Sequence, residues 1–205
     1  MIACLDLEGV LVPEIWINVA EKTGIAELRL TTRDIPDYDV LMKQRLRILD
    51  QHHLKLQDIQ EVIATMNPLE GAQDFLHWLQ SEFQVIILSD TFYQFAAPLM
   101  KQLQYPTLFC HSLKVEKSGQ ITDYRLRMKD QKRESVKKLK DLNFKVAAAG
   151  DSYNDIGMLE AADVGIFFCP PEKIVTEYPQ FQVALDYGQL KTAFQKAMEQ
   201  FSTGT

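Results

Sequence analysis

Two carboxylic acids, Asp6 and Glu8, stand one residue apart at the end of the first apolar run of the chain. A short apolar run that leads to a glycine, here Gly9, predicts a buried strand of a parallel sheet. Ligands bind beyond the carboxyl ends of such strands, and side chains at this spacing project the same way. Neighbouring carboxylates repel one another, so they need a cation, a shared proton or a division of roles. The alternative is two solvated acids at the end of a strand.

Two further predicted strands end in polar residues of the same kind. One covers residues 84–88 and leads into Ser89-Asp90-Thr91, and the other covers residues 145–149 and leads into Gly150-Asp151-Ser152-Tyr153-Asn154-Asp155. Between them lies a basic cluster made of Arg125, Arg127, Lys129, Lys132 and Arg133. In a parallel sheet these strand ends share one edge. Carboxylates there suit Mg²⁺, and hydroxyl, N–H and lysine groups suit the oxygens of a phosphoryl group.

The elements that position these residues alternate between helix and strand from Glu70 onward. Strands are expected at 84–88, 107–110, 145–149 and 164–168, and helices at 72–81, 92–104, 131–139, 158–162 and 189–200. Such alternation is typical of an α/β fold. A hairpin is expected across residues 113–127, around Ser118-Gly119-Gln120. We therefore expect a Rossmann-like, three-layer core with a parallel sheet, which also carries a small β-hairpin.

Residues 13–68 have a helical pattern without a strand. Helices are expected at 14–23, before Gly24, at 38–52, after Asp37, and at 56–66, before Asn67-Pro68. This predicts a helical cap domain at residues 13–68, inserted into a catalytic core made of residues 1–12 and 69–205.

The composition is ordinary for a globular protein of 205 residues, with 46% hydrophobic and 24% charged residues. The net charge of −6 argues against a protein that binds nucleic-acid backbones. No apolar run approaches the roughly 18 residues of a membrane span, and the first run does not match a signal peptide. Cys4, Cys110 and Cys169 lie in separate apolar runs, which predicts buried thiols in a reducing compartment. We expect a cytoplasmic protein that binds neither nucleic acid nor membranes.

The order of these motifs resembles the haloacid dehalogenase superfamily. The chain has D-x-E-x-V at Asp6–Val10, an apolar strand that ends at Ser89, then a lysine, then G-D-x-x-N-D at Gly150–Asp155. With a helical cap after the first strand, it is most similar to the phosphoserine phosphatase branch. The resemblance implies a Mg²⁺-dependent phosphatase that acts on phosphoserine through an aspartyl-phosphate intermediate, with water or homoserine as the acceptor.

The same resemblance gives roles to the acids. Asp6 matches the nucleophile, whose second oxygen binds Mg²⁺. Glu8 matches the general acid and base, and its backbone carbonyl matches a metal ligand. Asp151 matches a further metal ligand, and Asp155 matches an acid that positions a metal-bound water or the lysine. Many family phosphatases have Asp where this chain has Glu8, and we hypothesise that the longer side chain alters the balance between water and an alcohol as acceptor.

The residues implied to hold the phosphoryl group are Ser89, through its hydroxyl, and Asp90, through its backbone N–H. Lys132 matches the lysine that neutralises charge between the nucleophile and the phosphate. Lys129, three residues earlier, stays an alternative. Asn154 matches a substrate contact.

Two residues of the predicted cap match groups that recognise an amino acid. Arg45 matches the arginine that binds the substrate carboxylate through two N–H groups, with Arg47, roughly 200° away on the same helix, as the alternative. Glu14 falls nearest the glutamate that binds the substrate amine, displaced by one residue against the first motif.

Other interpretations stay open. The same machinery could hydrolyse another small phosphate ester, and recognition of a zwitterion by Arg45 and Glu14 would discriminate the two. A dehalogenase would have no leaving alkoxide for Glu8 to protonate. A response-regulator receiver also phosphorylates a strand-end aspartate, but receivers are shorter and lack a helical insert. The sequence does not give the oligomeric state, for which a homodimer is one candidate.

Overall fold

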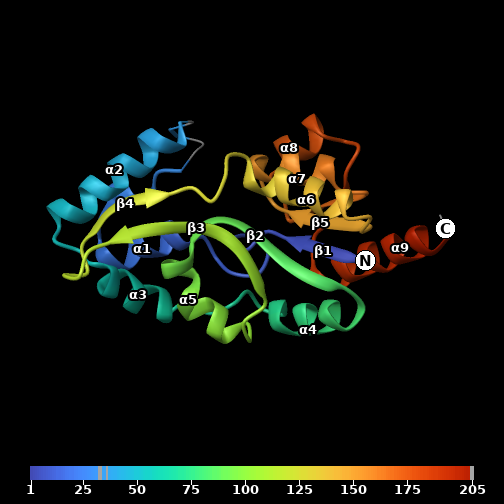
Figure 1. The fold of residues 1–205 in the computed structure, drawn as a ribbon, viewed down its shortest axis with the longest axis horizontal. Helices are drawn as coiled ribbons and strands as arrows, with labels where there is room; N and C mark the ends of the chain where they lie inside the picture. The colour runs from blue at the N-terminus through green and yellow to red at the C-terminus, as the bar shows by residue number, and fades with distance from the viewer. Residues whose placement is uncertain (32–33, 36, 204–205) are drawn as a thin grey trace.

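The computed structural model describes residues 1–31, 34–35 and 37–203 of the chain. Its centre is a seven-stranded sheet in the order β4-β3-β2-β1-β5-β6-β7 (Figure 1). The strands are β1 (Ile2–Leu5), β2 (Gln84–Phe92), β3 (Thr107–Val115), β4 (Ile121–Arg125), β5 (Val146–Gly150), β6 (Val164–Phe168) and β7 (Gln182–Ala184). Neighbouring strands are parallel, except that β3 and β4 form an antiparallel hairpin. The expected α/β fold with a small hairpin is confirmed.

Strand β1 lies in the middle of the sheet and pairs with β2 on one side and β5 on the other. All four of its side chains are buried, as expected for a strand covered on both faces. Ala3 and Leu5 face one core, and Ile2 and Cys4 face the other. Asp6 therefore leaves the sheet at the centre of its carboxyl edge.

Helices cover both faces of the sheet and complete the three layers (Figure 1). On the face of Ala3 and Leu5 lie α4 (Ala72–Glu82), α5 (Tyr93–Gln102) and α9 (Tyr187–Thr203). On the face of Ile2 and Cys4 lie α6 (Gln131–Asp141), α7 (Ile156–Ala161) and α8 (Glu172–Glu177). None of the helices within the described residues is long and apolar enough to cross a membrane.

Between β1 and α4 the described chain is helical. It forms α1 (Ile15–Thr23), the 3-10 helix η1 (Ala26–Arg29), α2 (Tyr38–Gln51) and α3 (Leu56–Ala64). Gly24 ends α1 with a φ of +72°, and the Asp37 side chain accepts a hydrogen bond from the Val40 N–H at the start of α2. Both predicted caps are thus confirmed. The apolar faces of these helices join the core of α4 and α5, and the division into cap and core domains stays a prediction.

The β3–β4 hairpin lies along α2, at the end of the molecule away from the two termini (Figure 1). The Tyr124 hydroxyl donates to Asp39 Oδ1 at 2.6 Å, near the start of α2. Gln120 Nε2 donates to Asp50 Oδ1 at 2.7 Å, near the end of the same helix. The Gly119 carbonyl at the hairpin tip accepts from the first backbone N–H of α3. The hairpin therefore holds α2 at both of its ends.

Several elements differ from the expectation. Strand β2 continues past Leu88 to Phe92, because it pairs again with β3 after a register shift. Strand β3 is a single strand rather than a short strand followed by half a hairpin. The elements η1, α8 and β7 were not predicted, since each is too short for a periodic signal. Cys169 is exposed, contrary to expectation, because it follows the end of β6 in a turn with a φ of +46°.

Candidate active site

The carboxyl ends of β1, β2 and β5 meet at one edge of the sheet and border a single cavity. The residues preferred from the sequence for catalysis or substrate binding all line this cavity: Asp6, Glu8, Glu14, Arg45, Ser89, Asp90, Lys132 and Asn154. Asp151 lines it as well, and Asp155 lies buried behind it. The parallel topology therefore gathers groups that are up to 148 residues apart, from Asp6 to Asn154.

Lys132, on α6, contacts two carboxylates at the floor of the site. Its Nζ lies 2.8 Å from Asp6 Oδ1 and 2.7 Å from Asp155 Oδ1, and all three side chains are buried. Burial alone would lower the pKa of Lys132, but Asp155 and Asp6 outweigh it and raise the pKa well above its usual value. Lys132 is therefore charged. Lys129 is exposed on the loop before α6, so the geometry favours Lys132 as the lysine at Asp6.

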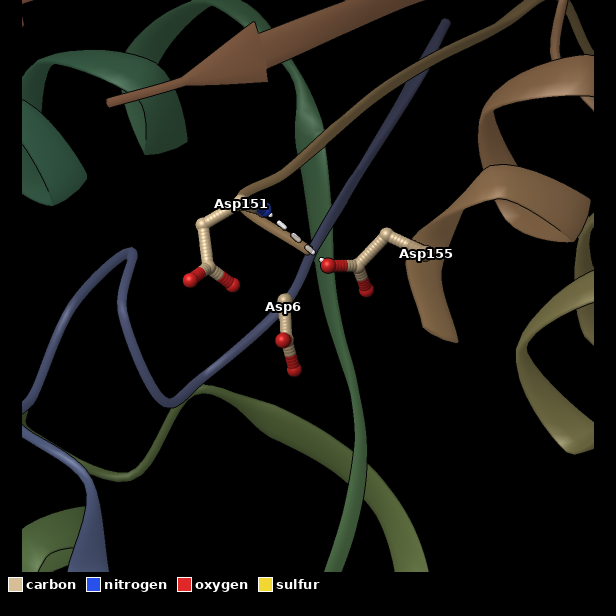
Figure 2. A group of neighbouring side chains, drawn as sticks. All are labelled: Asp6, Asp151 and Asp155. Atoms are coloured by element: carbon tan, nitrogen blue, oxygen red, sulfur yellow. Dashed lines mark hydrogen bonds between the residues drawn. The ribbon is translucent and has the colours of Figure 1, made fainter. Parts of the chain in front are cut away.

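Asp6, Asp151 and Asp155 form a candidate metal centre. Each offers a carboxylate oxygen, and these oxygens lie within 4.8 Å of one another (Figure 2). Burial, Asp155 and Glu14 raise the pKa of Asp151 to about 7, as expected where carboxylates crowd together. Asp155 is already engaged, by Lys132 at Oδ1 and by the Asp151 N–H at Oδ2, 3.0 Å away. A hard divalent cation would relieve the repulsion, so the donor set fits such an ion.

Two glycines make this close packing of acids possible. Gly9 has a φ of +79°, and a side chain there would overlap the Asp151 carboxylate. A side chain at Gly150 would overlap the Asp155 carboxylate in the same way. The turn after β1 and the end of β5 therefore need glycine for a steric reason.

Glu8 stands in the turn after β1, partly accessible from the cavity. Its Oε2 accepts a hydrogen bond from the Ile15 N–H at 2.7 Å, at the start of α1. Burial and the neighbouring Glu14 raise the pKa of Glu8 to about 8, although Ile15, Arg45 and Lys132 oppose the shift. The carboxyl group is therefore protonated at neutral pH, and it is suited to give a proton to a leaving group.

Arg45 enters the cavity from α2 and is buried. Its guanidinium lies 4.5 Å from the ring centroid of Trp16, and its Nη2 donates to the Leu30 carbonyl at 2.7 Å. Its Nε is buried and has no hydrogen-bond partner among the described residues. Burial lowers the pKa of Arg45 to about 10, so the group stays charged at neutral pH. A buried guanidinium with an unpaired N–H is suited to bind an anion, and a carboxylate can accept two hydrogen bonds from it side by side.

The other candidate residues of the predicted cap lie further out. Glu14, the residue before α1, is exposed at the rim of the cavity. Arg47 is exposed on α2, where its Nε contacts the Lys43 carbonyl at 3.4 Å, and it does not line the cavity. The structure thus favours Arg45 over Arg47.

A hydrogen bond joins the segment Ser89–Thr91 of β2 to the segment Gly150–Asp155 at the end of β5. The buried Ser89 hydroxyl accepts from the Thr91 N–H at 3.3 Å. Asn154 Nδ2 donates to Asp90 Oδ2 at 3.2 Å, and Asn154 Oδ1 accepts from the Ser152 hydroxyl. The 3-10 helix η2 (Tyr153–Asp155), which follows β5, therefore supports the segment Ser89–Thr91 of β2.

Sequence reasoning missed several residues that line or support the site, and four of them contact Arg45 or Asp90. Tyr38 lines the cavity and donates to the Asp90 carbonyl at 3.1 Å; its position seven residues before Arg45, on the same helix face, could have revealed it. The other three, which no local pattern marks, are Trp16, His111 and Gln131.

Comparison with known proteins agrees with this geometry. The family described as haloacid dehalogenase-like hydrolase matches residues 2–163. The phosphoserine phosphatase ThrH of Pseudomonas aeruginosa is 63% identical over 196 residues, which is 96% of each chain. A phosphoserine phosphatase of Pseudomonas syringae pv. tomato is 61% identical over 196 residues, 96% of this chain and 83% of its own.

A solved structure of a phosphoserine phosphatase in apo form has the same fold. Its TM-score is 0.71 at 22% sequence identity, and the match covers 89% of this chain and 91% of that one. The resemblance seen in the motifs is therefore confirmed by a family match over most of the chain and by close relatives. The protein is an enzyme that belongs to the haloacid dehalogenase-like hydrolase family.

Proposed function

We propose that this enzyme is a Mg²⁺-dependent phosphoserine phosphatase that forms an aspartyl phosphate on Asp6 and passes the phosphoryl group to water or homoserine. Two close relatives carry the name phosphoserine phosphatase, which supports the substrate. One observation of the site carries the choice of an amino-acid phosphate. The cavity holds Asp6 with Lys132 and also a buried guanidinium, Arg45, with an unused N–H.

Phosphoserine matches this arrangement at each of its charged groups. Its phosphate belongs at Asp6 and Lys132, its carboxylate at Arg45, and its ammonium at the Glu14 carboxylate on the rim. Residues 13–68 act as a cap that supplies Arg45 and Glu14 and limits the entry of water.

The first step transfers the phosphoryl group to the enzyme. A carboxylate oxygen of Asp6 forms a bond to phosphorus as the bond from phosphorus to the serine oxygen breaks. Glu8 gives its proton to that serine oxygen, for which a pKa of about 8 keeps it ready at neutral pH. Lys132, the Ser89 hydroxyl and the Asp90 backbone N–H hold the phosphoryl oxygens.

The second step restores the enzyme. The ionised Glu8 takes a proton from water or from the homoserine hydroxyl, whose oxygen bonds to phosphorus as the bond to Asp6 breaks. Asp6, Asp151 and the Glu8 carbonyl would hold Mg²⁺, which when bound neutralises the carboxylates and the phosphate. Homoserine has the carboxylate and ammonium of serine, so Arg45 and Glu14 can bind either one.

Labelling tests the covalent step. Brief incubation with ³²P-phosphoserine and Mg²⁺ is expected to label the protein, and hydroxylamine should release the label, as it does from acyl phosphates. Asp6→Asn is expected to abolish label and phosphate release, whereas Asp141→Asn, at an exposed position, should leave both unchanged. Phosphate release from wild type without a label on Asp6 would contradict the mechanism.

Substrate recognition is tested at Arg45. Removing a charge-assisted hydrogen bond from bound substrate costs roughly 1.5–3 kcal/mol, or about 10- to 100-fold. Arg45→Lys is therefore expected to raise the KM for phosphoserine by that factor, with little change for phosphoethanolamine, which lacks the carboxylate. Arg47→Lys is the matched control on the same helix. Equal efficiency of the wild type on both esters would favour a phosphatase for another small ester instead.

The acceptor is tested with homoserine. Addition of homoserine to the phosphoserine reaction is expected to yield phosphohomoserine at the expense of free phosphate. Phosphate as the sole product would restrict the proposal to hydrolysis.

A further inference from the structure

The Asp90 carboxylate is held by side chains from three separate elements. His111 Nε2 on β3 lies 3.5 Å from Oδ1, and Gln131 Nε2 on α6 lies 3.4 Å from the same oxygen. Asn154 donates to Oδ2 at 3.2 Å. Burial acts against ionisation, but Lys132, His111 and Asn154 outweigh it and hold the pKa of Asp90 below its usual value. The carboxylate is therefore ionised and is directed toward donors of the protein.

The contacts of the His111 ring determine which of its nitrogen atoms can donate to Asp90. Its ring is buried, and Nδ1 accepts a hydrogen bond from the Arg127 backbone N–H at 3.1 Å. In the neutral ring the proton must therefore be on Nε2, the atom that faces Asp90. The rings of Tyr38 and Phe92, each 6.3 Å away between centroids, pack against it and fix its plane.

The backbone around Asp90 is held as well. The Tyr38 hydroxyl donates to the Asp90 carbonyl at 3.1 Å, and the Gln131 amide donates to the Ser89 carbonyl. The segment Ser89–Thr91 lies at the register shift within β2, and we name it the phosphate-binding segment. It therefore has contacts from α2, β3, α6 and the 3-10 helix η2.

We propose that His111 is a positioning residue of the reaction, which acts through the Asp90 carboxylate to position the phosphate-binding segment. This inference rests on the proposed function, because in that function this segment binds the phosphoryl oxygens. The Ser89 hydroxyl and the Asp90 N–H must meet the phosphoryl oxygens as charge develops on them. A displacement of about 1 Å in such groups can lower a rate by roughly 100-fold. His111 does not line the cavity, so it acts on the phosphate-binding segment and not on the substrate.

Two substitutions of His111 separate positioning from packing. A glutamine side chain would place its amide N–H near the ring position of Nε2, whereas an asparagine amide would end near Nδ1 and fall short of Asp90. His111→Asn is therefore expected to lower kcat about tenfold with little change in KM, and His111→Gln is expected to recover kcat to within about threefold. His77→Asn, at an exposed histidine of α4, should match the wild type. Equal losses in the two His111 variants would overturn the proposal.

A double-substitution cycle tests the route through Asp90. In the Asp90→Asn background, His111→Asn is expected to cause no further loss, because the carboxylate on which it acts is gone. A second tenfold loss in that background would show that His111 acts by another route.

The same variants are to be assayed with para-nitrophenyl phosphate, which shares only the phosphoryl group with phosphoserine. The His111→Asn loss should be the same factor for both esters. Wild-type activity on para-nitrophenyl phosphate without activity on phosphoserine would defeat the proposed substrate and leave the positioning test intact. A loss confined to phosphoserine would contradict the positioning role.

Discussion

Gly9 occupies a place where backbone conformation and electrostatics coincide. Its positive φ lets the chain turn directly after β1, and its missing side chain leaves the space that the Asp151 carboxylate fills. Gly24 has a similar φ of +72° but has nothing within 4 Å of the position of a side chain. The two glycines thus share a backbone conformation, but only Gly9 lies against a residue of the candidate site.

Substituting each of these glycines separately distinguishes the cost of backbone strain from an effect on the candidate metal centre. Gly9→Ala and Gly24→Ala are each expected to lower stability by about 1–2 kcal/mol, the usual penalty for a left-handed L-residue. Under the proposed function, Gly9→Ala should also raise the Mg²⁺ concentration for half-maximal activity by about 10- to 100-fold, since it displaces Asp151. Thermal unfolding and Mg²⁺ titration of activity measure the two effects. An unchanged Mg²⁺ requirement in Gly9→Ala would show that Asp151 does not hold the ion.

The β3–β4 hairpin has a role at the scale of elements. It contacts α2 near both ends, and α2 carries Tyr38 and Arg45 into the cavity. The distance of Arg45 from the sheet edge is therefore set partly by a hairpin that itself contributes no residue to the cavity lining.

Loss of one hydroxyl should loosen this helix. Tyr124→Phe removes the bond to Asp39, and a hydrogen bond contributes roughly 0.5–1.5 kcal/mol net. The α2 amides are expected to exchange with deuterium about threefold to tenfold faster, with a higher KM for phosphoserine. Tyr93→Phe is the control, because its hydroxyl bonds to Leu108, away from α2. Equal acceleration across the whole chain in Tyr124→Phe would point to global destabilisation instead.

Prediction from the sequence succeeded where a local pattern and a topological rule were enough. Apolar runs that end in acids marked the ends of β1 and β5, and parallel pairing implies that Asp6 and Asp151 meet. It failed for the contact of His111 with Asp90, which depends on a register shift between β2 and β3. It also failed for Trp16 against Arg45, which depends on how α1 and α2 pack. Such contacts come from tertiary packing and leave no periodic trace in the chain.

At the scale of the whole molecule, the three cysteine thiols lie at different depths below the surface. Burial raises the pKa values of Cys4 and Cys110 to about 12, and both side chains are inaccessible. Cys169 is exposed, and burial, Asp186 and Asp151 raise its pKa less strongly. Because the thiolate is the reactive form, a raised pKa lowers reactivity at pH 8, and reactivity grows as the pH rises toward the pKa.

Iodoacetamide at pH 8 is therefore expected to modify Cys169 alone in the native protein, at a rate that still increases above pH 9. Cys4 and Cys110 should react only at the rate of global unfolding, which mass spectrometry in increasing urea can follow. Cys169→Ser should leave the native protein unmodified. Rapid modification of Cys4 without denaturant would contradict the central, covered position of β1.

The central place of β1 also bears on how the protein is made. The strand is synthesised before both of its neighbours, which begin at Gln84 and Val146. At about 5–20 residues per second, roughly 7 to 30 seconds separate its emergence from that of β5. During that interval an apolar strand has nowhere to pair on one side and is open to chaperones or to other nascent chains. Insertion of β1 between β2 and β5 brings Asp6 to the sheet edge that holds Asp151, so under the proposed function the nascent chain gains its activity only after most of it has left the ribosome.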